Sequence, residues 1–255
     1  SKHKSISFEL EGTNSAGDLG AAASVSFQHR NLFRGSETFM VKFRGAYEAI
    51  SGLQPGYKNH NYTEYGVETS INFPNFLFPF LTSDFKRRIK ATTEFGLQYN
   101  YQLRPEFSRT IASASWSYKW MQKQKIQHRI DFLDISYLYL PWISSQFQED
   151  YINKDKDNYI LKYNYENRLI VRMGYNYSYN SAGGALVNNT ITTNSYSIRA
   201  GFESAGNILY GISKMINMRK NKDGEYAILG IPYAQYLKGD FDFAKNIIID
   251  HRNSL

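Results

Sequence analysis

Apolar and polar residues alternate along most of the chain. Ile6, Phe8 and Leu10, for example, are separated by Ser7 and Glu9, and similar stretches recur as far as residue 203. Successive side chains of a strand point to opposite faces of a sheet. The pattern therefore predicts strands that have one apolar face and one polar face.

We expect about eleven strands, and several of them are long. They cover residues 4–12, 19–30, 37–48, 62–73, 89–100, 109–120, 126–138, 167–180, 193–204, 230–243 and 246–255. Globular strands usually have about five or six residues, whereas membrane-crossing strands need roughly 9–11 at a tilt. Strand length therefore favours an all-β fold, an antiparallel transmembrane β-barrel. No linker divides residues 1–255 into two domains.

The connections between these strands also follow a pattern. If the first strand runs outward, the outer connections are 13–18, 49–61, 101–108, 139–166 and 205–229, and the inner ones are 31–36, 74–88, 121–125, 181–192 and 244–245. The outer set is on balance longer, as in outer-membrane barrels, although 74–88 is long for an inner turn. Two outer connections show helical patterns, Ser144–Lys154 and Ser204–Asn217, the second with Ser204 as the expected N-cap.

The aromatic content supports a position between water and lipid. Aromatic residues make up 16% of the chain, with 21 Tyr and 17 Phe beside 3 Trp. Tyr has an apolar ring and a polar hydroxyl, which suits such a boundary. Many aromatic residues lie near predicted strand ends, as in the girdles of membrane barrels: Tyr47, Tyr65, Phe73, Tyr99, Trp116, Trp120, Tyr137, Tyr139, Tyr177 and Tyr179. The mean hydropathy of −0.51 is compatible with a barrel, because only alternate residues face lipid.

Several classes of function lack their sequence signals. The chain has no Cys, and its five His show no metal-ligand spacing. No phosphate-binding loop, hydrolase elbow or zinc-protease motif is present. The net charge of +7 would suit nucleic acid, but the basic residues are dispersed. We therefore expect no enzyme activity, no cofactor or metal, and no nucleic-acid partner. Basic clusters in connections, such as Lys86–Arg88, are either solvated charges or contacts for anionic lipid head groups.

Two segments near the N-terminus resemble the opening barrel strands of the BamA/TamA outer-membrane superfamily. Phe8–Gly20 contains EGTN and GDLG, and Ser24–Glu37 ends in NLFRGSE. The turn motif comprises Asn31, Leu32, Phe33, Arg34, Gly35 and Glu37. Asn72–Phe80, Glu203–Asn207 and Gly230–Tyr236 are similar to later segments of lipoprotein-type TamA relatives, which favours that branch.

The resemblance implies a sixteen-stranded barrel preceded by periplasmic POTRA domains. At about 22 residues per strand and turn, the 255 residues supply about eleven strands. The family's Val-Arg-Gly motif, which follows strand eleven, is absent. We therefore expect this chain to be the N-terminal two-thirds of a barrel in the outer membrane.

The resemblance also implies a function. The first and last strands of such barrels meet at a weak seam, where a client's strand pairs with the backbone of the first strand. The expected pairing residues are Ser5, Ile6, Ser7, Phe8, Glu9, Leu10, Glu11 and Gly12. Outer-membrane lipids, client outer-membrane proteins and accessory periplasmic or inner-membrane subunits are the expected partners.

Three alternatives remain open at the level of sequence. The first strand could belong to a static barrel without a client. The barrel could be a passive pore or an adhesin, whose lumen charges set selectivity or whose outer loops bind ligands. A soluble β-sandwich also alternates, with its polar face in water.

Overall fold

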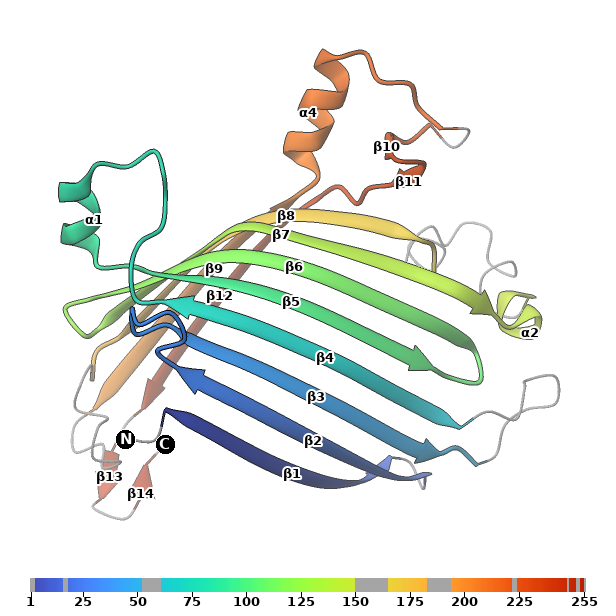
Figure 1. Ribbon diagram of the computed structural model, residues 1–255, viewed down its shortest axis with the longest axis horizontal. Coiled ribbons are helices and arrows are strands. Elements are labelled where there is room, and N and C mark those ends of the chain that lie inside the picture. Colours follow the sequence, from blue (N-terminus) through green and yellow to red (C-terminus); the bar gives the residue numbers. More distant parts are fainter. Residues whose placement is uncertain are drawn as a thin grey trace.

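One antiparallel sheet of ten strands dominates the molecule (Figure 1). The computed structural model describes residues 3–15, 18–51, 61–149, 165–182, 194–221, 224–246, 248–250 and 253–254. The strands of the sheet, in spatial order, are β1 (Lys4–Ser15), β2 (Asp18–Arg30), β3 (Thr38–Ala49), β4 (Tyr62–Phe73), β5 (Thr92–Leu103), β6 (Phe107–Gln122), β7 (Ile126–Ile143), β8 (Arg168–Asn180), β9 (Ser195–Ala205) and β12 (Tyr236–Asn246). The predicted all-β class is confirmed.

The alternating sequence sets the register of this sheet. Phe8 lies opposite Val25, Val25 opposite Phe43, and Phe43 opposite Val67, so that an apolar row crosses four strands. A slip of one residue would move every side chain to the other face, so the alternation holds each strand in place. Two strands, β6 and β7, contain irregular pairing near Trp116 and Ser117.

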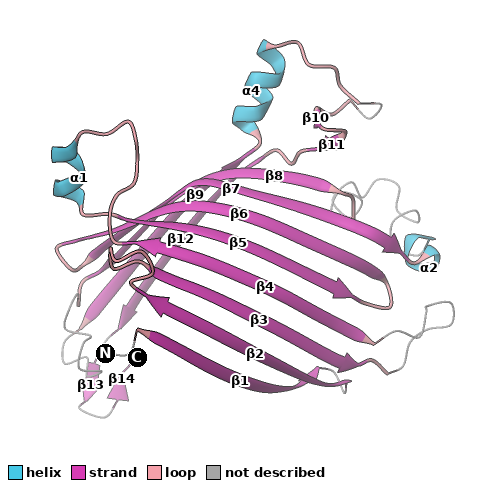
Figure 2. Cartoon of the chain, in the orientation of Figure 1, coloured by secondary structure: helices cyan, strands magenta, loops and turns pink. Residues whose placement is uncertain are grey.

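The sheet is curved and has two free edges. In Figure 2 it bends like a trough, with β9 and β12 behind the nearer strands. A cavity of about 320 Å³ on the polar face is lined by residues from Gln28 of β2 to Arg172 of β8, and this side of the sheet is called the hollow side below. Among the described residues, β1 pairs with β2 and β12 pairs with β9, with no ladder joining β1 to β12.

Two of the predicted strands near the C-terminus differ from the observed elements, the first in its bounds and the second in its form. In place of a strand over 230–243, a two-residue strand β11 (Ile231–Pro232) pairs with β10 (Ala227–Ile228), and β12 begins at Tyr236. Leu229 and Gly230 both have positive φ, which forms a tight turn between β10 and β11. In place of a strand over 246–255, β13 (Ile248–Asp250) and β14 (Asn253–Ser254) form a small separate hairpin.

The helices also differ from the expectation. The connection between β4 and β5 contains α1 (Ser83–Ile89), and β5 begins at Thr92 instead of residue 89. The helix α4 (Asn207–Met215) lies inside the predicted helical range, but its N-cap is Gly206, and Ser204 belongs to β9. The helix α2 (Ser145–Phe147) covers three residues of the weaker pattern, and residues 150–154 of that pattern lie outside the described residues. No described helix has the length and apolarity needed to cross a bilayer.

Candidate functional site

The backbone of β1 divides into two alternating sets. The amide of Arg30 donates a hydrogen bond of 2.7 Å to the carbonyl oxygen of His3, so these two residues form a hydrogen-bonded pair. In an antiparallel ladder, hydrogen-bonded and non-hydrogen-bonded pairs alternate. The β1–β2 register is regular from Lys4 to Ser15. Odd-numbered residues of β1 therefore direct their N–H and C=O groups at β2, and even-numbered residues direct theirs away from the sheet.

This alternation splits the predicted pairing segment in half. Ser5, Ser7, Glu9 and Glu11 are the residues bonded to β2. The residues whose backbone groups face outward are Ile6, Phe8, Leu10 and Gly12. Sequence reasoning found the strand but could not separate these sets, because the direction of the backbone depends on the side on which β2 lies.

The side chains of the outward set lie on the apolar face and are exposed. Ile6, Phe8 and Leu10 expose 62%, 75% and 85% of their surface. An ideal Cβ at Gly12 would meet nothing within 4 Å, so the edge is open there as well. An edge with outward backbone groups and apolar side chains is a template for another strand.

The polar side of β1 is held to the sheet by charged side chains. Glu9 pairs with Lys42 of β3 at 3.8 Å, and Glu11 pairs with Arg44 of β3 at 3.2 Å. Both pairs cross β2, which has the small residue Ser24 beneath them. Solvent-exposed pairs of this kind contribute about 0.2–1 kcal/mol each. They link β1 to β3 on the polar face and leave the outer edge of β1 uncovered.

The opposite edge of the sheet has the same arrangement, which sequence reasoning missed. The amide of Gly206 bonds the carbonyl oxygen of Val171 at 2.9 Å, so even-numbered residues of β9 bond to β8 and odd-numbered ones to β12. The register then directs the backbone of Leu237, Phe241 and Phe243 outward. These side chains are 66%, 71% and 59% exposed. Counting alternate residues from one known hydrogen bond identifies both sets.

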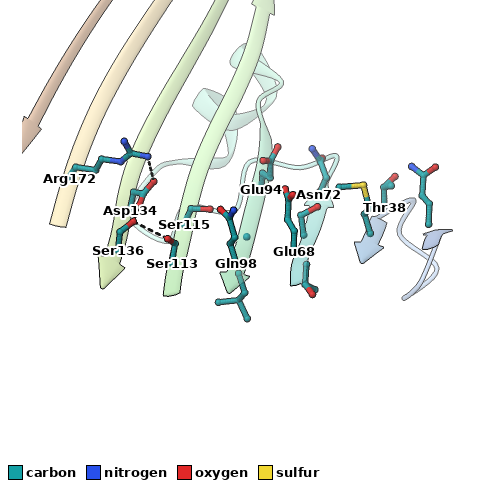
Figure 3. Close-up of a pocket in the computed structure, with 16 residues that line it drawn as sticks. Thr38, Glu68, Asn72, Glu94, Gln98, Ser113, Ser115, Asp134, Ser136 and Arg172 are labelled. Atoms are coloured by element: carbon teal, nitrogen blue, oxygen red, sulfur yellow. Dashed lines mark hydrogen bonds and ion pairs between the residues drawn. The ribbon is translucent and has the colours of Figure 1, made fainter. Parts of the chain in front are cut away.

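The hollow polar face gathers charged and hydroxyl groups from several strands. Figure 3 shows Glu68, Glu94, Gln98, Asp134 and Arg172 around one cavity. Arg172 donates to Asp134 at 2.7 Å and lies 3.5 Å from Glu203, whose carboxylate accepts a hydrogen bond from the hydroxyl of Tyr236.

The cavity's charges are mostly paired with each other. The ammonium of Lys119 is 2.7 Å from the carboxylate of Glu94. The hydroxyl of Ser136 donates a hydrogen bond to Asp134 at 3.1 Å and accepts one from the hydroxyl of Ser113 at 3.0 Å. Among the described residues, no group of three or more His, Asp or Glu could hold a metal ion.

The predicted motif between β2 and β3 forms a self-contained turn. The carboxylate of Glu37 accepts hydrogen bonds from the amides of Phe33 at 3.2 Å and Gly35 at 3.1 Å. The side chain of Asn31 accepts one from the amide of Ser36 at 3.0 Å. Asn31, Arg34 and Ser36 have φ near 66°, an uncommon conformation for residues with side chains.

The charge of Glu37 is stabilised by this turn. Glu37 is 8% exposed, and burial alone raises the pKa of its carboxyl. Hydrogen bonds from its own amide and from those of Gly35 and Phe33 outweigh burial, so its pKa lies below its usual value. Asn31, Gly35 and Glu37 thus each have a structural role. Leu32, Phe33 and Arg34 complete the turn, and the side chain of Phe33 is 66% exposed.

Comparison of the chain with models of protein families, with curated proteins and with solved structures found no match. The site therefore rests on its own geometry, namely an apolar-faced free edge at β1, a similar edge at β12, and a charged hollow face between them.

Proposed function

We propose that this chain is part of an outer-membrane β-barrel that inserts or translocates other outer-membrane proteins by pairing with their strands at β1. The observation that carries the proposal is the free edge of β1, where Ile6, Phe8 and Leu10 combine outward backbone groups with exposed apolar side chains. The similarity of the opening segments and of the 31–37 turn motif to the BamA/TamA superfamily supports the same function.

The exposed apolar face supports a position among outer-membrane lipids. Phe43, Leu97 and Phe202, on strands across the sheet, are 54%, 62% and 56% exposed on that face. Twelve residues at about 3.3 Å each span about 40 Å, and a tilt of about 45° leaves about 28 Å. That distance is close to the roughly 30 Å of a bilayer's hydrocarbon core. Strands such as β1, β3 and β4 have twelve residues each.

The proposed mechanism is an exchange of hydrogen bonds. A client strand entering beside β1 bonds to the outward N–H and C=O groups of Ile6, Phe8 and Leu10, which is β-augmentation. In hydrocarbon, an unpaired strand edge is costly, so each backbone bond formed there favours the paired state. The exchange requires no cofactor. Accessory periplasmic or inner-membrane subunits would deliver the client and are part of the proposal.

A disulfide at Ser7 tests this pairing. In an antiparallel client, Ser7 falls at a non-hydrogen-bonded position, where the Cα atoms of partners lie about 4.5 Å apart, within the range for a disulfide. The 255 residues contain no Cys, so Ser7→Cys introduces a single thiol among them. The experiment expresses full-length protein carrying Ser7→Cys with an outer-membrane client that has single cysteines in its terminal strand, and measures disulfide-linked adducts.

Ser26→Cys is the matched control. Ser26 lies opposite Ser7 on β2, at the same height on the same face, but has strands on both sides. We expect adducts at Ser7→Cys and none at Ser26→Cys. Protein that inserts normally but forms no adduct at Ser7→Cys, or equal adducts at both positions, contradicts the proposal.

A passive pore is the second candidate, and the hollow polar face favours it. Charged groups of both signs line the cavity of about 320 Å³, among them Glu68, Glu94 and Arg172. In a water-filled barrel such groups set ion selectivity. A pore predicts steady conductance without any client adduct at β1, so the disulfide experiment also separates the two functions.

A further inference from the structure

The connection between β4 and β5 folds back onto the apolar face of the sheet. The hydroxyl of Thr93, which is fully buried, accepts a hydrogen bond from the amide of Leu77 at 2.8 Å and donates one to the carbonyl oxygen of Asn75 at 2.7 Å. The hydroxyl of Tyr118 donates to the carbonyl oxygen of Leu77 at 3.1 Å. The segment 74–90 is thereby fixed to β5 and β6, and α1 extends beyond the ends of β4 and β5 (Figure 1).

The aromatic side chains of this segment continue the apolar face. Phe76 packs edge-on against Tyr118, with ring centroids 4.7 Å apart, and Phe78 packs against Phe132 at 5.4 Å. Phe132 in turn contacts Trp116, which belongs to the apolar rows of the sheet. The segment therefore lies on the side of the sheet that we propose faces lipid, and not on the hollow side.

Large apolar side chains at the outer end of the segment are uncovered. Phe80 is 87% exposed, and Phe85 and Leu77 are 42% and 41% exposed. Phe80 packs on Phe78, so its ring is attached to the same aromatic cluster but has no cover of its own. Exposed apolar side chains beside an already apolar surface indicate an interaction site.

Basic residues follow these aromatic residues directly. Lys86, Arg87 and Arg88 lie in the last turn of α1, and Lys90 is its C-cap. Asp84 is the acidic residue of this helix, and none of the four cations forms an ion pair within the described part of the chain. Aromatic residues followed by unpaired cations match a bilayer's interface, where acyl chains meet phosphate groups.

We infer that segment 74–90 is a membrane-interface anchor that binds anionic phospholipid head groups. Phe80 and Phe85 enter the boundary between acyl chains and head groups, and Lys86, Arg87 and Arg88 contact lipid phosphates. This inference rests on the proposed membrane position of the sheet. It adds a specific lipid class and a specific end of the barrel, because the segment follows the end of β4 opposite to the β1–β2 hairpin.

Quenching by brominated lipids tests the anchor. Full-length Phe80→Cys protein carries a bimane fluorophore and is reconstituted into vesicles containing brominated phosphatidylglycerol or brominated phosphatidylcholine. Each basic residue near an anionic surface favours association by about fivefold. We therefore expect quenching with a preference for phosphatidylglycerol of about fivefold or more. Replacing Lys86, Arg87 and Arg88 together by Gln should remove that preference while Phe80 stays in contact with lipid.

Two neighbouring positions of β5 serve as controls. Leu97 lies in the apolar row beside Ala114, and Gln98 lies in the polar row between Glu68 and Ser113. Quenching at Leu97→Cys but not at Gln98→Cys supports the lipid-facing sheet itself. If Leu97→Cys is quenched and Phe80→Cys is not, or if Phe80→Cys shows no lipid preference, the anchor is wrong and the proposed function stands. If neither Leu97→Cys nor Phe80→Cys is quenched, the membrane position fails, and the anchor fails with it.

Discussion

The carboxylate of Glu37 occupies the space that a side chain at Gly35 would need. An ideal Cβ at Gly35 would lie 2.1 Å from Oε1 of Glu37, well inside any possible contact. Oε2 of the same carboxylate accepts a hydrogen bond from the amide of Gly35. The side chain of Glu37 folds over Gly35 to reach its amide, so a side chain at position 35 would have to move the end of the Glu37 side chain away from that amide.

Gly35→Ala should therefore destabilise the protein. The added methyl group must displace the buried carboxylate and its hydrogen bonds, and overpacking of this kind costs about 1–3 kcal/mol. Gly45→Ala in β3 is the control, since a Cβ there meets nothing within 4 Å. The measurement is the midpoint of unfolding in detergent. The folded fraction is read from the difference in gel mobility between folded and unfolded protein in unheated samples. Equal midpoints for both variants would contradict the packing argument.

The stability of the turn should depend on pH through Glu37. Because its pKa in the folded protein is lowered, the ionised carboxylate favours folding. That contribution is present above the usual pKa of about 4.5 and is lost as the pH falls through the lower folded pKa. Glu37→Gln should be less stable than the unmodified protein at pH 7, and the difference should shrink towards pH 3. A difference that is independent of pH, measured by thermal unfolding, would disprove this role.

Proline should distinguish the two sets of backbone groups in β1. Phe8→Pro removes an outward amide and leaves the β1–β2 ladder intact, whereas Ser7→Pro removes an amide that bonds to Ser26. We expect Ser7→Pro to lower stability by about 0.5–1.5 kcal/mol more than Phe8→Pro, the contribution of one backbone hydrogen bond. We expect Phe8→Pro to reduce client pairing. Unfolding midpoints give the first comparison, and client insertion rates give the second. Similar stability losses in the two variants would show that the alternation is assigned wrongly.

The strands were predictable because their signal is local. Period-two alternation in segments such as 62–73 and 167–180 places each strand within a few residues of its observed bounds. The element α1 gives no such signal, since it has seven residues and is held by contacts of its preceding loop with Thr93 and Tyr118, distant in sequence. The short β10–β11 hairpin interrupts an apparently continuous apolar run, because Tyr233 and Ala234 pair beside Leu169 of β8 instead of continuing a strand.

The candidate edge was predictable in outline but not in detail. The first strand can be identified from its position and alternation, and Ile6, Phe8 and Leu10 can be placed on one face. Which backbone N–H and C=O groups of the first strand point outward depends on the side on which β2 pairs with it. The sequence pattern of the strand itself does not contain that information. The edge at β12 was not predicted. The sequence pattern placed the start of this strand at residue 230, within the region where the β10–β11 hairpin forms, instead of at Tyr236.

Replacing Arg172 should change ion selectivity if the polar face lines a pore. Arg172 balances Asp134 at 2.7 Å and Glu203 at 3.5 Å, so Arg172→Gln leaves two carboxylates uncompensated in the cavity wall. The lumen becomes more negative, and cation selectivity in planar bilayers should rise. Arg172→Lys is the control, because it keeps a positive charge beside Asp134 and Glu203. An unchanged reversal potential for Arg172→Gln would contradict the hypothesis that the polar face lines a pore.

Thr93→Val should loosen segment 74–90 without changing its aromatic or basic residues. The hydroxyl of Thr93 accepts a hydrogen bond from the amide of Leu77 and donates one to the carbonyl oxygen of Asn75. In the variant this amide and this carbonyl group both lose their partner. Leaving such groups unsatisfied costs about 1–3 kcal/mol each. Hydrogen exchange in the peptide that contains Leu77 should therefore become at least about tenfold faster. Thr92→Val is the control, since Thr92 bonds to Lys119 of β6 and not to the segment. Equal exchange in the two variants would show that tertiary hydrogen bonds from Thr93 do not hold the segment, and that its aromatic contacts with Tyr118 suffice.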